Sequence, residues 1–387
     1  MIKFNYKYDK GFIAEFNKDF INNLMMKKIS VLLETCLIKD NDYFRYKKLK
    51  AVLSEDSIRK LVFCRPAETK KYVNYVYGLL PVLADRYNSK IVYKDALVDF
   101  SLAKAPISNS SQKKEMLDYK SFLRIELFRL VKEWDSVSSK YLLSILDSDN
   151  KAVTVRKVIR IIESLSNGSR SGISSKDSSN YPEWVNEFYK VFDYQELSRK
   201  YGYRIIKASG LKVCPYCGAE EINTIIGRRK HRPDIDHFLP KSKYPFFSAS
   251  LFNFIPAGGI CNKSFKREDD LIDGYLHPLI DGVDNDDVFS FGFNMLDNSV
   301  NISIFDIDKF SRNRELFQLK DVYTGKKYKD RYLKMRDLYL FTRQVDREGE
   351  FKNFFFKAFD LTSDFTFKNK CNKKFDDDAF KHIAKNV

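Results

Sequence analysis

Residue types that support metal and proton chemistry are concentrated between positions 214 and 266 of this 387-residue chain. The segments concerned are Cys-Pro-Tyr-Cys-Gly at 214–218, Asp-Ile-Asp-His at 234–237 and Cys-Asn-Lys-Ser-Phe-Lys at 261–266. His237 suits a general base, because an imidazole titrates near neutral pH. Asp236 and Asn262 suit the binding of Mg²⁺, which prefers hard oxygen ligands. Hydrolysis of a phosphodiester needs both a base and a divalent cation.

Asn253 adds an amide to this set, sixteen residues after His237. We expect its side chain to hydrogen-bond the backbone of the loop that carries His237, so that its role is orientation. Consecutive side chains of a regular strand point to opposite faces. Asp236 and His237 can therefore serve one site only if the strand begins, twists or bulges there.

The ordered set resembles the motif of HNH endonucleases, members of the ββα-metal or His-Me finger superfamily. The resemblance covers about 200–275, and it implies strands near 234–239 and 252–256 followed by a helix from about Gly258. It further implies that His237 is the general base and that Asn253 supports the site. Asp236 and Asn262 would bind the catalytic Mg²⁺ or Mn²⁺.

Three cysteines predict a second, structural metal site. Cys214 and Cys217 form a Cys-x-x-Cys pair, and Cys261 precedes Asn262. Neighbours on a helix diverge by about 100°, so Cys261 can face a structural Zn²⁺ while Asn262 faces the catalytic metal. A redox pair is disfavoured because no βαβ pattern surrounds Cys214. A turn held by packing without any metal is the alternative.

The fourth zinc ligand is less well defined. Proteins of the family resembled commonly place another cysteine three residues before the third one, but position 258 is Gly in this chain. His277 is the nearest candidate, because a neutral imidazole is a good zinc ligand.

The chain carries 68 Lys and Arg against 52 Asp and Glu, a formal charge of +16. Such an excess attracts phosphates, although a generally basic protein would share it. Cations beside the motif are expected to contact the nucleic-acid backbone without reading its sequence. These residues are Arg228, Arg229, Lys230, Arg232, Lys241, Lys243, Lys263 and Lys266. A solvated hairpin tip is the alternative interpretation of the group before position 233.

Hydrophobic periodicity predicts a mixed, mainly α protein, and the resemblance implies that it contains a small ββα-metal (HNH) domain with a zinc knuckle. The expected regions are a helical N-terminal region at 1–163, a Ser/Gly-rich linker or loop at 164–180, the HNH domain with a lead-in helix at 181–275, and an α+β C-terminal region at 276–387. Within the last region, alternating residues around 289–304 predict a hairpin, and helices are expected from about 310.

The resemblance implies cleavage of DNA. We expect little sequence preference, because no sequence-reading module is recognisable. The segment Asp-His-Phe-Leu-Pro-Lys-Ser at 236–242 resembles nuclease effectors of bacterial anti-phage defence, which are often controlled by an ATPase or another sensor. An RNA-cleaving enzyme and a catalytically silent zinc-knuckle module remain alternatives. A cytoplasmic protein without membrane contact is expected, since no apolar run approaches the roughly eighteen residues of a membrane helix.

Overall fold

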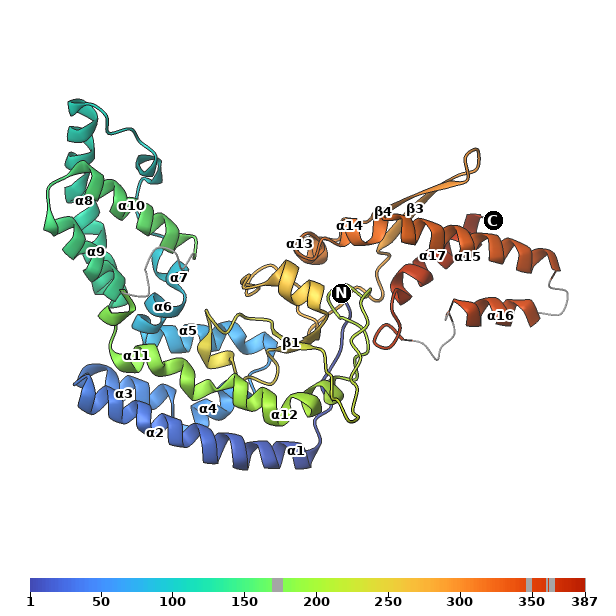
Figure 1. Cartoon of the computed structure of the whole chain (residues 1–387), viewed down its shortest axis with the longest axis horizontal. Coiled ribbons are helices and arrows are strands. Elements are labelled where there is room, and N and C mark those ends of the chain that lie inside the picture. The colour runs from blue at the N-terminus through green and yellow to red at the C-terminus, as the bar shows by residue number, and fades with distance from the viewer. Residues whose placement is uncertain (169–176, 346–349, 360, 362–365, 387) are drawn as a thin grey trace.

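The computed structural model of the chain describes residues 1–168, 177–345, 350–359, 361 and 366–386. This described part is mainly helical and contains two small antiparallel sheets, in agreement with the expected mainly α class (Figure 1). Strand β1 lies near the centre, between the N-terminal helices and the C-terminal hairpin. None of the described helices has the length and apolar character needed to cross a membrane.

The first 168 residues form helices joined by short turns. They are α1 (Lys10–Glu15), η1 (Phe16–Met25), α2 (Met26–Glu34), η2 (Thr35–Lys39), α3 (Tyr43–Val52), α4 (Glu55–Val62), η3 (Pro66–Glu68), α5 (Thr69–Leu79), α6 (Pro81–Tyr87), α7 (Ser89–Tyr93), η4 (Phe100–Ala103), α8 (Ser110–Trp134), α9 (Val137–Ser148) and α10 (Ala152–Ser166). Helix α8 begins with a capping box between Asn109 and Gln112, which satisfies backbone donors at its start. Its apolar stripe, including Leu123 and Leu127, is buried as expected of a core face.

The predicted linker at 164–180 is partly helical, because α10 continues to Ser166. Residues 169–176 lie outside the described ranges, and a short turn, η6 (Asp177–Asn180), follows them. The lead-in then consists of α11 (Glu183–Glu187), η7 (Phe188–Phe192) and α12 (Tyr194–Ser209). The side chain of Asp193 caps α12 by accepting from the Glu196 amide, and Gly210 ends that helix with a φ of 65°.

Strand β1 (Asp234–His237) pairs antiparallel with β2 (Phe254–Ala257), with Asp236 opposite Ile255 and His237 opposite Phe254. The loop between them contains the turn η8 (Pro245–Phe247), and β2 leads into the short helix η9 (Ile260–Lys266). The expected order of strand, strand and helix is therefore present. Both strands are shorter than their predicted ranges, and the helix begins at Ile260, close to its expected start.

The N-terminal segment packs against this central unit. The amide of Ile2 donates to the carbonyl of Pro215 at 2.8 Å, and the hydroxyl of Tyr6 donates to the carbonyl of Phe254 at 2.8 Å. Residues far apart in the sequence thus share one packed environment around β2.

The C-terminal region confirms the predicted hairpin and the helices after it. Strand β3 (Phe289–Asn294) pairs with β4 (Ser299–Ile304), and Phe289 and Phe291 on β3 are buried. The remaining elements are η10 (Asp308–Phe310), α13 (Ser311–Leu316), α14 (Leu319–Thr324), α15 (Lys326–Val345), α16 (Glu350–Ala358) and α17 (Lys373–Asn386).

Candidate functional site

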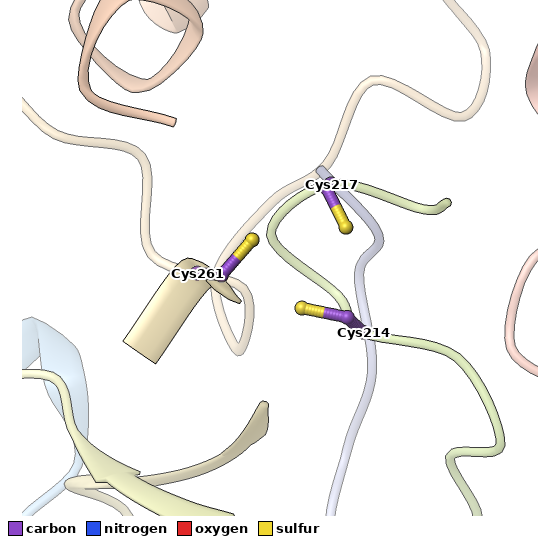
Figure 2. A group of neighbouring side chains, drawn as sticks. All are labelled: Cys214, Cys217 and Cys261. Carbon is purple, nitrogen blue, oxygen red and sulfur yellow. The ribbon is translucent and has the colours of Figure 1, made fainter. Parts of the chain in front are cut away.

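The sulfur atoms of Cys214, Cys217 and Cys261 lie within 4.8 Å of one another, and all three residues are buried. Figure 2 shows that they converge, two from the turn and the third from the start of η9. A buried group of three thiols brought together from two segments could hold a metal ion such as zinc.

The turn that carries Cys214 and Cys217 is stabilised by hydrogen bonds within the turn and by one from the C-terminal region. Gly218, with a φ of 72°, donates its amide to the carbonyl of Cys214 at 2.8 Å, a conformation that favours glycine. The amide of Ala219 lies 3.4 Å from the sulfur of Cys217. The hydroxyl of Tyr323 in α14 donates to the carbonyl of Cys217 at 2.7 Å, so the C-terminal region supports the turn.

The three thiols also interact with one another. Hydrogen bonds from Cys214 and then Cys261 hold the pKa of Cys217 well below its usual range. One sulfur is therefore stabilised as a thiolate by its neighbours. Metal binding would release the remaining protons, since thiolates are the ligands.

The structure does not place His277 with the cysteines. Its Nδ1 accepts from the Leu279 amide at 3.1 Å, and its ring centroid lies 4.0 Å from that of Phe238. Within the described ranges, no His, Asp or Glu atom joins the three sulfurs at the same mutual spacing. The prediction of His277 as fourth ligand is therefore not supported. Packing of the imidazole against Phe238 determines its position.

Asp236 is buried, and both of its carboxylate oxygens have partners. The hydroxyl of Tyr216 donates to Oδ2 at 2.5 Å, and the ammonium of Lys266 lies 3.1 Å from Oδ1. Lys266 also donates to the carbonyl of His237 at 2.7 Å. The prediction that Lys266 contacts a nucleic-acid phosphate is wrong in this structure, because its ammonium is enclosed with Asp236. Tyr216 lies between the two cysteines of the turn and was not predicted.

The ring of His237 is fixed by packing and by one hydrogen bond. Its centroid lies 4.4 Å from that of Tyr194 and 5.2 Å from that of Phe254. Nε2 lies 3.0 Å from the carbonyl oxygen of Ser248. A carbonyl can only accept, so Nε2 carries the proton and Nδ1 has the free lone pair of the neutral imidazole.

Burial lowers the pKa of His237 to about 3, and the nearby charges of Lys241 and Lys266 act in the same direction. The imidazole is therefore neutral at physiological pH, which is the form that can accept a proton.

Asp236 and His237 contact different parts of the molecule. Asp236 faces Tyr216 and η9, whereas His237 packs against Tyr194 at the start of α12. The pairing of β1 with β2 is regular and has no bulge, and the strand ends at His237, so the alternation of side chains need not continue past that residue.

The side chain of Asn253 binds the loop that follows His237. Its Oδ1 accepts from the Leu239 amide at 2.8 Å, and its Nδ2 donates to the carbonyls of Leu239 at 3.0 Å and Phe247 at 3.1 Å. The amide thus joins two points of that loop, immediately before β2 begins.

Asn262 is half-buried on η9, four residues before Lys266. Residues at this separation begin from the same side of a helix, and Lys266 reaches β1. The carboxylate of Asp236 and the amide of Asn262 have the oxygen atoms that Mg²⁺ prefers. Both carboxylate oxygens of Asp236 already have partners in Tyr216 and Lys266, so an ion at this position would have to share or displace those contacts.

Among the predicted phosphate contacts, Arg228, Arg229 and Lys230 are exposed at a hairpin tip. The tip is closed by reciprocal backbone hydrogen bonds of 2.9 and 3.0 Å between Ile225 and His231.

Arg232 differs, because it is half-buried and donates to Ser198 Oγ of α12 at 2.6 Å. Its guanidinium anchors the hairpin to that helix, so it is not a free surface cation.

The other predicted cations surround the loop between the strands. The ammonium of Lys241 lies 5.0 Å from the ring centroid of Tyr194, beside His237. Lys263 is largely exposed and pairs with Asp234 at 2.9 Å, and Lys243 is half-buried. Lys241 is exposed and lies over the ring that packs against His237.

A segment of 92 residues, 23% of the chain, is 36% identical to protein ea31 of Escherichia phage lambda. The matched segment is 28% of the phage protein's length. No family model matches the chain, and no solved structure matches it.

Proposed function

We propose that this protein is a metal-dependent HNH-type endonuclease that hydrolyses DNA phosphodiester bonds. The orientation of His237 carries the proposal: Nε2 is committed to the Ser248 carbonyl, which leaves Nδ1 as the proton acceptor. The order of β1, β2 and η9 supports it, with Asp236 on β1, Asn253 immediately before β2 and Asn262 on η9.

In the proposed reaction, Nδ1 of His237 takes the proton of the attacking water. The Ser248 carbonyl holds the imidazole and stabilises the charge that Nε2–H then shares. Asn253 keeps the loop after His237 in place. Asp236 and Asn262 would hold Mg²⁺ or Mn²⁺, which would supply neutralisation of charge on the phosphate.

The exposed cations Arg228, Arg229 and Lys230, together with Lys241, would position the DNA backbone. Contacts of this kind carry no sequence information, so we propose low sequence specificity. A role as an anti-phage effector controlled by an ATPase or another sensor rests on the motif resemblance. The name of the phage lambda relative, protein ea31, states no activity.

A catalytically silent zinc-knuckle module is the second candidate, and the environment of Asp236 favours it. Tyr216 and Lys266 already occupy both carboxylate oxygens, so the carboxylate is neutralised without a metal ion. Such a module would bind nucleic acid or a partner protein through the same exposed cations.

The two candidates are separated by incubating the full chain with plasmid DNA, single-stranded DNA and RNA, each with Mg²⁺, with Mn²⁺ or with EDTA. The proposal predicts metal-dependent cleavage of DNA. Cleavage confined to RNA would change the substrate class. Binding without cleavage under every condition would favour the silent module.

A further inference from the structure

We propose that Glu220 is the fourth ligand of a zinc ion bound by Cys214, Cys217 and Cys261. The inference concerns the cysteine cluster alone and does not depend on nuclease activity. It arises from what lies beside Gly258, three residues before Cys261.

The carboxylate of Glu220 occupies the space of the side chain that position 258 lacks. A Cβ atom added to Gly258 would lie 1.9 Å from Glu220 Oε2 and 2.2 Å from its Cδ. No residue with a side chain fits at 258 while Glu220 is in place. A carboxylate, which can bind zinc, therefore fills the space beside Gly258, and it comes from the segment that follows the cysteine turn.

The backbone fixes that segment beside the cysteine turn. The amide of Cys214 donates to the carbonyl of Glu220 at 2.9 Å, and Val213 pairs with Glu221 in an isolated bridge. Glu220 thus leaves the turn directly alongside Cys214, and its side chain extends toward the start of η9.

One oxygen of this carboxylate has a partner and the other has none. Oε1 accepts from the Gly259 amide at 2.9 Å, whereas Oε2 is buried without a hydrogen bond. An unsatisfied buried acceptor is unfavourable, and more so when it is charged. A cation shared with the three sulfurs would satisfy it. Carboxylate oxygen is an accepted zinc donor beside thiolates.

The oxygens of Glu220 are outside the 4.8 Å group formed by the sulfurs. Ion binding would therefore require the carboxylate to turn from its place above Gly258. A competing role is simple capping of η9 through Oε1. Glutamine can still cap a helix but is a poor zinc ligand, so Glu220→Gln distinguishes the two roles.

The test uses the full chain and compares wild type with Glu220→Gln, with Glu221→Gln as the exposed neighbouring control. Zinc affinity is measured by chelator competition, and the ligand set by the absorption spectrum of the Co²⁺-substituted protein. Changes outside the ligand set of a metal typically cost 10–100-fold in affinity. We expect Glu220→Gln to lose about 100-fold, with a changed Co²⁺ spectrum, and Glu221→Gln to match wild type.

A double variant supplies the positive control. Glu220→Ala removes the carboxylate and opens the space beside residue 258, so adding Gly258→Cys should restore tight binding with the spectrum of a four-thiolate site. X-ray absorption at the zinc edge of wild type should show three sulfur ligands and one oxygen ligand from the protein. Zinc binding and a Co²⁺ spectrum unchanged by Glu220→Gln would overturn the inference, as would a wild-type site with four sulfurs or with no zinc.

Discussion

The ammonium of Lys266 lies 3.1 Å from the carboxylate of Asp236, and these two side chains are only 1% and 4% exposed. Lys266 also donates to the carbonyl of His237. The lysine therefore joins η9 to the end of β1, beside the proposed general base. Removing one member of such a buried pair leaves an uncompensated charge, which typically costs about 3–5 kcal/mol.

We predict that Lys266→Met lowers the free energy of unfolding by several kcal/mol, measured by urea denaturation. The matched control is Lys263→Met, whose pair with Asp234 is largely exposed on the lysine side and should be worth about 1 kcal/mol or less. If Asp236 can bind Mg²⁺, added Mg²⁺ should restore part of the stability of Lys266→Met. Equal losses in the two variants would mean that the buried pair contributes no more to the free energy of unfolding than the exposed pair does.

The loop after His237 should depend on Asn253. Asn253→Ala removes three hydrogen bonds from a buried side chain and should destabilise the protein by about 1–3 kcal/mol or more. Amide hydrogen exchange at Leu239 should accelerate. Asn223→Ala, which loses only an exposed contact to Glu221, is the control and should leave both measurements unchanged.

The elements around the site could be predicted because the motif fixes their order and local periodicity fixes their type. The direction of individual side chains could not. The sequence predicts Lys266 on the surface because most lysines are solvated. Its side chain is buried instead, because it pairs with the buried carboxylate of Asp236. The positions of the Arg232 and His277 side chains could not be predicted either. Arg232 contacts Ser198 and His277 contacts Phe238, and each of these partners is far away in the sequence.

Two buried histidines should make stability depend on pH. Burial lowers the pKa of both His237 and His277 to about 3, from an ordinary value near 6.5. Between these values the unfolded chain binds more protons than the folded protein, so stability falls as the pH falls below about 6.5, and the loss continues toward pH 3.

His277→Asn isolates one of these contributions, because Asn retains an acceptor for the Leu279 amide. The stability advantage of wild type over this variant should shrink between pH 7 and pH 5, with a slope of at most about 1.4 kcal/mol per pH unit. A constant difference over this range would show that His277 is not held neutral by burial.

The exposed hairpin tip should govern the salt dependence of DNA binding. Changing Arg228, Arg229 and Lys230 to Gln should weaken binding to all sequences equally and reduce the salt slope by about one unit for each lost contact. The control is Lys10, Lys18 and Lys27 changed to Gln, which removes the same charge from exposed helical positions. Equal effects of both triple variants would indicate general charge rather than a contact surface.

The central claim is that His237 is the general base of a nuclease, and the most direct test is the rate of DNA cleavage with Mg²⁺ for wild type and His237→Ala. The comparison variant is His277→Asn, which alters another buried histidine outside the proposed site. We predict a loss of about 10²–10⁴-fold in His237→Ala, with folding and DNA binding retained, and a wild-type rate in His277→Asn. Cleavage by His237→Ala at the wild-type rate, or no cleavage by wild type itself, would contradict the claim.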